Sequence, residues 1–230
     1  MATTTALASP VTPAGPVGGP LPRAGSVLVV TARPGPESAD LGGVVYAFRR
    51  AGARLALLCL TRGEASSLNS TRSARLEAIR PWETNLAANV LGISGITVSS
   101  YPDGLVHRYP AAELAERVLC AVRRHSAELL LMIDPRTGDL DDLAVARAAC
   151  IAAGEEGIPV LVGSEPGAGD SWVIDLGAEA ATARAIQKCA AAAHESQSQA
   201  LPALIRRLDA RESVESLRWL AAPVPAPSHF

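Results

Sequence analysis

Residues 26–31 read SVLVVT, and ARPGPE follows directly at residues 32–37. A short run of apolar and β-branched residues is typical of a β-strand that is buried on both faces. Leu41–Ala51 then has apolar residues at helical spacing, and Arg54–Leu60 (RLALLCL) is a second run of the buried type. This order of strand, helix and strand predicts a βαβ unit with two parallel strands.

The same alternation continues along the chain. Further strands are expected at 96–100, 129–133 and 159–162, and further helices at 72–91, 111–125 and 140–156. We therefore predict an α/β fold with a Rossmann-like, mostly parallel sheet in the order 3-2-1-4-5 and helices on both faces.

After Gly163 the pattern changes. A short strand is expected at 172–175, an Ala-rich helix at 179–196 and a helical segment at 204–208. We expect this C-terminal part to pack on the α/β core as an appendage.

Composition limits the class of protein. The chain has 230 residues and a mass of 23.7 kDa, which suits a single α/β domain. Hydrophobic residues make up 48% and charged residues 19%, which excludes a disordered chain and a coiled coil. No apolar run reaches about 18 residues, so no membrane-spanning helix is expected. The net charge of −2 and the pI of 6.1 exclude a generally basic nucleic-acid binder.

The two ends differ from the middle. Residues 1–24 hold five prolines and a single charge, Arg23, and lack the basic start and apolar core of a signal peptide. We expect a disordered leader over 1–24, a single domain over 25–222 and a flexible tail over 223–230. The cysteines have no CxxC spacing, so we expect buried, reduced thiols and a cytoplasmic location: Cys59, Cys120, Cys150 and Cys189.

Two loops form the expected site. In an open parallel sheet, ligands bind beyond the carboxyl ends of the strands, where the strand order reverses. The first strand runs into Ala32–Glu37, and the fourth runs into Asp134–Asp142. With the strand order 3-2-1-4-5, these two loops face each other.

Five segments outside these loops carry a family resemblance. They are Thr61–Leu68 (TRGEASSL), Arg80–Gly92 (RPWETNLAANVLG), Tyr101–Leu105 (YPDGL), His194–Gln197 (HESQ) and Leu217–Leu220 (LRWL). In this order and spacing the chain resembles the PIG-L/LmbE family of zinc-dependent N-deacetylases, over roughly Ser26 to Leu220. The family includes the sugar deacetylases of low-molecular-weight thiol pathways.

The resemblance implies a zinc site that this chain has altered. In the family, A-H-P-D-D-E follows the first strand and T-G-H-P-D-H follows the fourth. The first His, the second Asp and the last His ligate zinc, the first Asp is the general base, and the His of the second motif stabilises the oxyanion. This chain reads ARPGPE at 32–37 and TGDLDD at 137–142, so Glu37 and Asp141 match. Arg33, Pro36 and Asp142 stand at the three positions of the zinc ligands. Gly35 stands at the position of the general base, and Asp139 at that of the oxyanion residue.

These replacements remove the family's chemistry. Arginine stays protonated, and proline and glycine have no side-chain ligand. We therefore predict no zinc, no other cofactor and no deacetylation of N-acetylated amino sugars. We also predict that the Arg33 guanidinium takes the place of the dication and pairs with Asp142, Asp139 or both. The alternative is that Arg33 points to solvent and the aspartates only cap a helix.

Several residues are candidates for binding a ligand: Arg33, Glu37, Arg62, Arg80, Asp103, Asp139, Asp141, Asp142 and His194. Each has a structural alternative. Arg62 and Arg80 match family arginines near the substrate but also suit ion pairs, and Asp103 suits a turn. Glu37 suits a helix start and His194 suits helix packing. Magnesium would suit the aspartates together with Glu37, but the sequence specifies no cage for it.

Other polar residues are weaker candidates. His107, His125 and His229 are expected in solvent. Ser66 and Ser67 have no base nearby in the sequence, so neither is expected to act as a nucleophile.

Three functions remain open. The first is a metal-free member that binds a small polar molecule, sugar-like or amine-like, or acts on it without zinc hydrolysis. The second is an interaction protein, either a homo-oligomer or a non-catalytic partner of an active paralogue. The third is a zinc-dependent N-deacetylase with rewired ligands.

Overall fold

The computed structural model describes residues 18–65, 73–165 and 170–222. The strands are β1 (Ser26–Thr31), β2 (Arg54–Thr61), β3 (Gly95–Tyr101), β4 (Leu129–Ile133), β5 (Val160–Ser164), β6 (Trp172–Asp175) and β7 (Val214–Ala221). The α-helices are α1 (Pro36–Ala39), α2 (Gly42–Arg50), α3 (Ser73–Leu91), α4 (Ala111–His125), α5 (Leu140–Glu156), α6 (Ala180–Ala192) and α7 (Leu201–Ala210). Short 3₁₀ turns lie at η1 (Val106–Arg108), η2 (Pro135–Thr137), η3 (Gly177–Glu179) and η4 (Glu195–Ala200).

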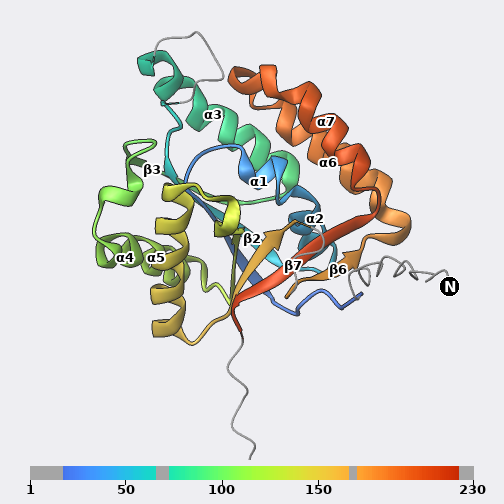
Figure 1. The fold of residues 1–230 in the computed structure, drawn as a ribbon, viewed down its shortest axis with the longest axis horizontal. Coiled ribbons are helices and arrows are strands. Elements are labelled where there is room, and N and C mark those ends of the chain that lie inside the picture. Colours follow the sequence, from blue (N-terminus) through green and yellow to red (C-terminus); the bar gives the residue numbers. More distant parts are fainter. Residues whose placement is uncertain (1–17, 66–72, 166–169, 223–230) are drawn as a thin grey trace, which may run out of the picture.

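All seven strands join one sheet in the order β3-β2-β1-β4-β5-β7-β6 (Figure 1). The first five strands are parallel, which confirms the predicted order 3-2-1-4-5. Strand β7 runs antiparallel to both β5 and β6 and lies between them. The predicted appendage is therefore wrong in part, because the C-terminal segment extends the sheet as well as adding α6 and α7.

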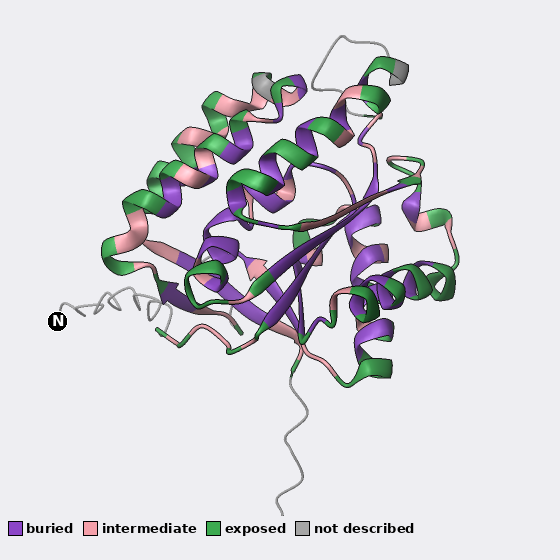
Figure 2. Ribbon diagram, turned by 180° about the vertical axis from the view of Figure 1, so that it is seen from behind, coloured by how far each residue is buried: buried purple, intermediate pink, exposed green. Residues whose placement is uncertain are grey.

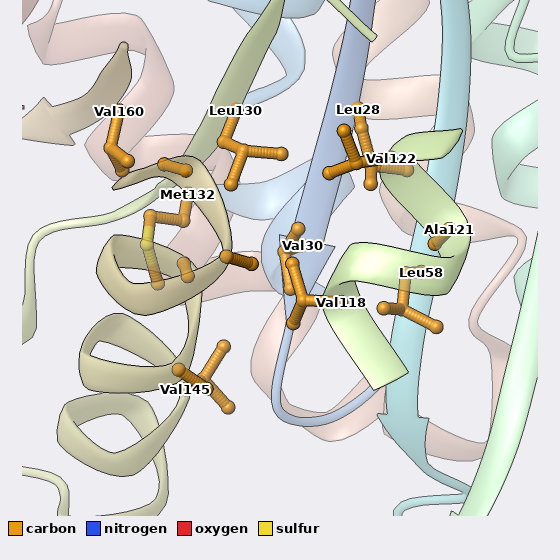
Figure 3. Packing of buried hydrophobic residues seen from close by; sticks show 14 of the residues in the cluster. Leu28, Val30, Leu58, Val118, Ala121, Val122, Leu130, Met132, Val145 and Val160 are labelled. Carbon is orange, nitrogen blue, oxygen red and sulfur yellow. The ribbon is translucent and has the colours of Figure 1, made fainter. Parts of the chain in front are cut away.

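Helices cover both faces of the sheet, as predicted. Successive residues of a strand point to opposite faces, so β1 contributes to two cores. Leu28 and Val30 face α4 and α5 (Figure 3). Val27 and Val29 belong to the other core, with α2, α3 and α6. The strands at the centre of the sheet are buried along almost their whole length (Figure 2).

Helix α5 begins at a side-chain cap. The Asp139 carboxylate accepts hydrogen bonds from the backbone N–H groups of Asp141 and Asp142, at 2.9 and 3.1 Å. These are two of the N–H groups that a helix start leaves without a partner. The cap fixes Asp142 in the first turn of α5, directly beyond the end of β4.

The leader predicted over 1–24 is too long. The backbone N–H of Gly19 donates to the Val173 carbonyl at 2.9 Å, and Gly18 forms a bridge with Val173 at the β6 edge of the sheet. Leu21 and Ala24 pack against the core that contains α2. The rest of the predicted leader and the predicted tail over 223–230 lie outside the described residues.

Two further sequence predictions concern membrane-spanning helices and the burial of the cysteines. Within the described residues, no helix is both long and apolar enough to cross a membrane. The prediction of four buried thiols is wrong: Cys59 is buried and Cys150 is partly buried, but Cys120 and Cys189 are exposed. The last two lie on the outer faces of α4 and α6, where solvent replaces the apolar surroundings that their sequence neighbours suggested.

Candidate functional site

The sheet places two loops side by side where the strand order reverses. Strand β1 pairs with β2 on one side and with β4 on the other. The connections that leave β1 and β4 therefore diverge, which opens a crevice at the carboxyl edge of the sheet. The loop after β1 carries Arg33, and the loop after β4 leads to Asp139 and Asp142.

Arg33 bridges the two loops. Its Nη2 donates to Asp139 Oδ2 at 2.8 Å and to Asp142 Oδ2 at 3.2 Å. The Arg33 and Asp139 side chains are 33% and 36% exposed, whereas that of Asp142 is 3% exposed. The predicted ion pair is confirmed with both aspartates. The alternative, a solvent-directed Arg33, is wrong, although Asp139 does also cap α5.

Arg33 lowers the pKa of both aspartates, but their net pKa shifts are opposite. Burial opposes ionisation of Asp139, but the hydrogen bonds from Arg33 and the helix N–H groups outweigh it and lower the Asp139 pKa. Burial raises the pKa of Asp142 to about 6, and Arg33 offsets it only in part. The negative charges of Asp139, Asp141 and Asp40 raise the Asp142 pKa further. The pKa of Arg33 itself is raised, because its two partners outweigh the effect of burial.

A cleft of about 680 Å³ opens beside Arg33. Its walls come from the loop after β1, α3, the turn after β3, the end of α6, and α7. Figure 1 labels these three helices. The volume suits a small molecule of sugar size or larger. The charged or hydrogen-bonding residues that line it are Arg33, Asp40, Arg80, Asp103, Asp139, His194, Gln197 and Arg207.

Arg80 forms one wall of this cleft from α3. It is 2% exposed, its Nε donates to Ser196 Oγ at 3.1 Å, and its Nη1 donates to the Gly63 carbonyl. Gly63 has a φ of +72°, and a Cβ there would lie 2.6 Å from Arg80 Nη1, so a glycine is needed. Arg80 Nη2 is buried without a hydrogen-bond partner in the described part of the chain. Burial lowers the Arg80 pKa, against the nearby charges of Glu83, Asp103 and Glu64.

Asp103 lines the same cleft from the turn after β3. Its carboxylate accepts from Thr61 Oγ1 at 3.3 Å and from the Ala65 N–H at 3.1 Å. The Asp103 N–H donates to Glu64 at 2.9 Å. Burial raises the pKa of Asp103, and Arg33 counteracts it in part. The predicted turn and the predicted place in the pocket are therefore both present.

Glu37 and His194 form a buried pair behind the loop that carries Arg33. Their closest atoms, Glu37 Oε1 and His194 Nε2, are 2.6 Å apart, and the side chains are 0% and 2% exposed. Glu37 also accepts from the Gly35 N–H at 2.8 Å. The pair joins the start of α1 to the end of α6. Only His194 lines the cleft, so Glu37 supports the wall from behind.

A second cavity of about 320 Å³ adjoins the cleft. The two share five lining residues: Arg33, Pro36, Asp40, Asp139 and Arg207. The second cavity lies toward β5 and β7, and its further ionisable residues are Asp134, Asp142, Glu165, Arg211 and Glu215. Six carboxylates and three guanidinium groups therefore line it.

Besides Asp40, which pairs with Arg207, three of these carboxylates have arginine partners other than Arg33. Glu215 is held by Arg184, and Arg211 is 3.3 Å from Glu165. Asp134 accepts from Arg218 Nε and Nη2 at 2.9 and 2.7 Å. Hydrogen bonds from Arg218 and Arg136 overcome the burial of Asp134 and lower its pKa to about 2.

Two predicted candidates lie away from both cavities. Arg62 pairs at 2.7 Å with Glu77, and both side chains are largely exposed. Asp141 accepts from the His107 N–H at 3.0 Å and contacts His107 Nδ1 at 2.7 Å. The expectation of a solvated His107 is therefore wrong, and so is that for His125, which is partly buried with Nε2 enclosed. His229, Ser66 and Ser67 lie outside the described residues.

Several lining residues were not predicted. Asp40 and Arg207, which line both cavities, pair at 2.7 Å. Gln197 donates from Nε2 to the Pro34 carbonyl at 3.2 Å, which ties η4 to the loop after β1. Gln197 lies in the HESQ segment, which offered a signal. Arg207 offered none, because its spacing is that of any charged residue on the outer side of a helix.

The residues at the family's zinc positions do not fit zinc. Arg33 is a protonated donor, Pro36 has no ligand atom, and Asp142 already accepts from Arg33. Zinc in a catalytic site needs three protein ligands. The described residues contain no group of three or more His, Cys, Asp or Glu side chains that could hold a metal ion.

Known structures resemble this fold. The N,N'-diacetylchitobiose deacetylase from Pyrococcus horikoshii has a TM-score of 0.69 at 17% identity, over 86% of this chain and 84% of that one. The conserved protein TT1542 from Thermus thermophilus has a TM-score of 0.70 at 19% identity, over 89% and 98%. The 4-carboxy-2-hydroxymuconate hydratase from Pseudomonas putida has a TM-score of 0.62 at 18% identity, over 89% and 99%. At these identities the likeness is one of fold.

The family is established by sequence. None of the curated proteins matches the chain significantly. The family described as PIG-L, GlcNAc-PI de-N-acetylase, matches residues 28–153, which is more than half of the chain and includes both loops of the site. The chain therefore belongs to the PIG-L family.

Proposed function

We propose that this chain is a metal-free member of the PIG-L family that binds a small polar molecule in the cleft and does not hydrolyse amides with zinc. The observation that carries this proposal is the ion pair of Arg33 with Asp139 and Asp142. It joins the two positions at which family members provide their first and last zinc ligands. A guanidinium held by two carboxylates leaves no ligand set for a dication there.

The chemistry of the cleft supports a polar ligand. Both cations and carboxylates line it, among them Arg33, Arg80, Asp103 and Asp139. Such walls suit hydroxyl groups, which both donate and accept hydrogen bonds. The base of the family mechanism is Gly35 here, which cannot take a proton from water.

The names of two solved neighbours are compatible with this proposal. One solved neighbour is named for deacetylating an acetylated amino sugar, and another for hydrating 4-carboxy-2-hydroxymuconate. The fold thus carries chemistry other than deacetylation in at least one protein. A cytoplasmic location is part of the proposal, because a reducing compartment would keep the exposed Cys120 and Cys189 as thiols.

Metal content and ligand-dependent stability test the proposal. The protein is purified without chelator, its zinc is measured, and thermal shifts are recorded with neutral and amino monosaccharides. We expect well under one zinc per chain and a stabilisation of about 2.7 kcal/mol at 100 times the Kd of a true ligand. Asp103→Asn should reduce that stabilisation. One zinc per chain together with chelator-sensitive deacetylation of N-acetylglucosamine would overturn the proposal.

A second candidate function is a non-catalytic partner subunit, of a paralogue or of a second copy. Trp82, Leu86 and Val90 recur every four residues on α3 and are 64%, 37% and 37% exposed. Arg80 and Glu83, the charged residues of this stretch, are buried, so the exposed face from Ala78 to Leu91 is uncharged. Light scattering of the parent and of Trp82→Glu tests self-association. A monomer in both cases would leave only the paralogue as a partner.

A further inference from the structure

The two edges of the sheet are protected to different degrees. The sheet ends in β6 on one side and in β3 on the other. Strand β6 has four residues and ends at Asp175, and residues 18–19 lie on its outer side, where the Gly19 N–H donates to the Val173 carbonyl. Edge strands are commonly shortened, charged or covered in this way, because their free N–H and C=O groups can pair with another chain.

Strand β3 has none of these protections. It has seven residues, GITVSSY from Gly95 to Tyr101, without a charge or a proline. Within the described residues it pairs with β2 alone. Alternate residues of β3 therefore direct their N–H and C=O groups away from β2, toward a side where the described chain supplies no further strand.

The exposed side of α3 is an independent observation at the same end of the sheet, because α3 packs against β3. Trp82, Leu86 and Val90 are three of the six large apolar side chains that are exposed in the described part of the chain. Arg80 and Glu83 are buried, so no exposed side chain between residues 78 and 100 is charged. The outer faces of α4 and α5, by contrast, carry several exposed arginines and glutamates.

We infer that two copies of this chain pair edge to edge through β3, related by a two-fold axis, and cover the exposed side of α3 in the same contact. The sheet then continues from one copy into the other. The inference makes the second-copy form of the second candidate function specific. It does not depend on ligand binding in the cleft, because neither β3 nor the three exposed apolar residues of α3 line that cleft.

Strand geometry and charge both favour a second copy as the partner. An antiparallel pair formed by the same strand places the free donors of each copy against the free acceptors of the other, and a two-fold axis produces that arrangement. Two uncharged faces meet without like-charge repulsion, whereas nucleic acid or an acidic membrane surface needs basic residues. Arg49 and His125 lie beside Gly92 and Gly95, as expected for the polar rim of such a contact.

The cavities argue against an extended peptide as the partner. A peptide that adds to a sheet edge gains its specificity from pockets for alternate side chains. No residue of β3 lines either cavity described above, or a third cavity of about 320 Å³ beside Tyr46. A two-fold pair needs no such pockets, because backbone groups and the apolar side chains of α3 supply the contact.

Light scattering of the full chain across a dilution series tests the inference. We expect twice the chain mass of 23.7 kDa at high protein concentration. Amide hydrogen exchange over residues 95–101 should slow as the concentration rises, because pairing protects the free N–H groups. Both measurements use the parent chain, so they do not depend on the folding of a variant.

Two variants and a matched control locate the contact. Thr97→Lys places a lysine of each copy near the middle of the strand pair and should give a monomer. Leu86→Lys should weaken self-association at least about tenfold. Ile151→Lys is the control, because Ile151 is an exposed apolar residue on another helix, α5, with 42% exposure against 37% for Leu86. It should associate like the parent, and circular dichroism checks that each variant is folded.

Each result bears on the contact and not on the cleft. A parent that is monomeric at every concentration, or exchange over residues 95–101 that does not change with concentration, would overturn the inference. A dimer that folded Thr97→Lys leaves intact would overturn the assignment to β3. Zinc content and ligand binding are measured separately, so a failure here is distinguishable from a failure of the proposed function.

Discussion

Asp134 and Asp142 are both buried carboxylates at the carboxyl edge of the sheet, and both contact arginine, yet their pKa values shift in opposite directions. Asp134 has a pKa of about 2, and Asp142 has one of about 6. Asp134 accepts from both sides, through two nitrogens of Arg218 and through the side chain and backbone of Arg136. Asp142 accepts from one nitrogen of Arg33, at 3.2 Å.

The number of donors, more than the presence of an arginine, decides the difference. Bidentate contacts compensate the desolvation of Asp134, whereas a single shared contact leaves Asp142 undercompensated among other carboxylates. The two carboxylates therefore differ in how completely their oxygens are paired. The Asp134 carboxylate accepts at both oxygens, whereas the Asp142 carboxylate accepts at one oxygen from a shared arginine nitrogen.

The largest effect is expected from Arg218→Ala. Arg218 and Asp134 are each 9% exposed, so the variant leaves a buried carboxylate with its bidentate partner missing. We expect a loss of about 3–5 kcal/mol in the free energy of unfolding, measured by chemical denaturation. Arg136→Ala is the control, and its loss should be much smaller because Arg136 is 47% exposed. Equal losses would show that Arg218 is not the main partner.

The next largest effect is expected when the pH dependence of the free energy of unfolding is compared between the parent and Asp142→Asn. A carboxyl whose folded pKa is about 6, above its unfolded value near 3.8, contributes stability below pH 4 that is lost as the pH rises through 6. The parent should therefore lose about 2–3 kcal/mol from this group between pH 4 and pH 8, and the Asn variant should not.

Asp134→Asn tests a pH dependence of stability with the opposite sign. Its lowered pKa means that Asp134 contributes stability above pH 4 that is lost as the pH falls through about 2. Parallel denaturation series for the two Asn variants and the parent measure both slopes. A parent and an Asp142→Asn variant with identical pH profiles would contradict the contrast between the two carboxylates.

Removal of Arg33 should have a smaller effect. Arg33 is 33% exposed, so Arg33→Ala loses a partly solvated cation but leaves the buried Asp142 without it. We expect a loss of about 1–3 kcal/mol at pH 8, between the values for exposed and buried pairs. The loss should shrink at pH 4, where Asp142 is protonated. Arg33→Lys, which restores the charge, should recover part of it, and a loss that is the same at both pH values would contradict the pairing.

The smallest effect is expected at Arg62. Its pair with Glu77 is exposed on both sides, so Arg62→Ala should change the free energy of unfolding by within about 0.5 kcal/mol. Ligand affinity should not change either, because Arg62 lines neither cavity. A clear loss of affinity in calorimetric titration would place Arg62 in the site after all.

The sequence predicted the parts of the fold that depend on local pattern. The limits of α4 and α5 and the parallel order of the first five strands follow from periodicity and from the rules of βαβ connection. The pair of Arg33 with Asp139 and Asp142 was also predictable, because a positive residue in one loop and two negative ones in the facing loop are complementary.

Contacts between distant segments were not predictable in this way. Arg218 and Asp134 lie 84 residues apart, and Arg207 and Asp40 lie 167 apart. Neither partner of such a pair carries a local signal, because an arginine on a strand or helix has the same spacing whether it meets solvent or a carboxylate. The site was therefore predicted at its centre and missed along the wall that α7 and β7 provide.

The position of β7 also has a consequence for how the chain assembles. Strand β7 is the last element along the described chain, yet it lies inside the sheet and joins β5 to β6. During synthesis, β5 is left with an open edge and β6 without a neighbour in the sheet until Val214–Ala221 emerges. The same strand brings Arg218 to Asp134, so the second arginine partner of this buried carboxylate arrives only at that late step. Completion of the sheet and completion of the second cavity are thus one event.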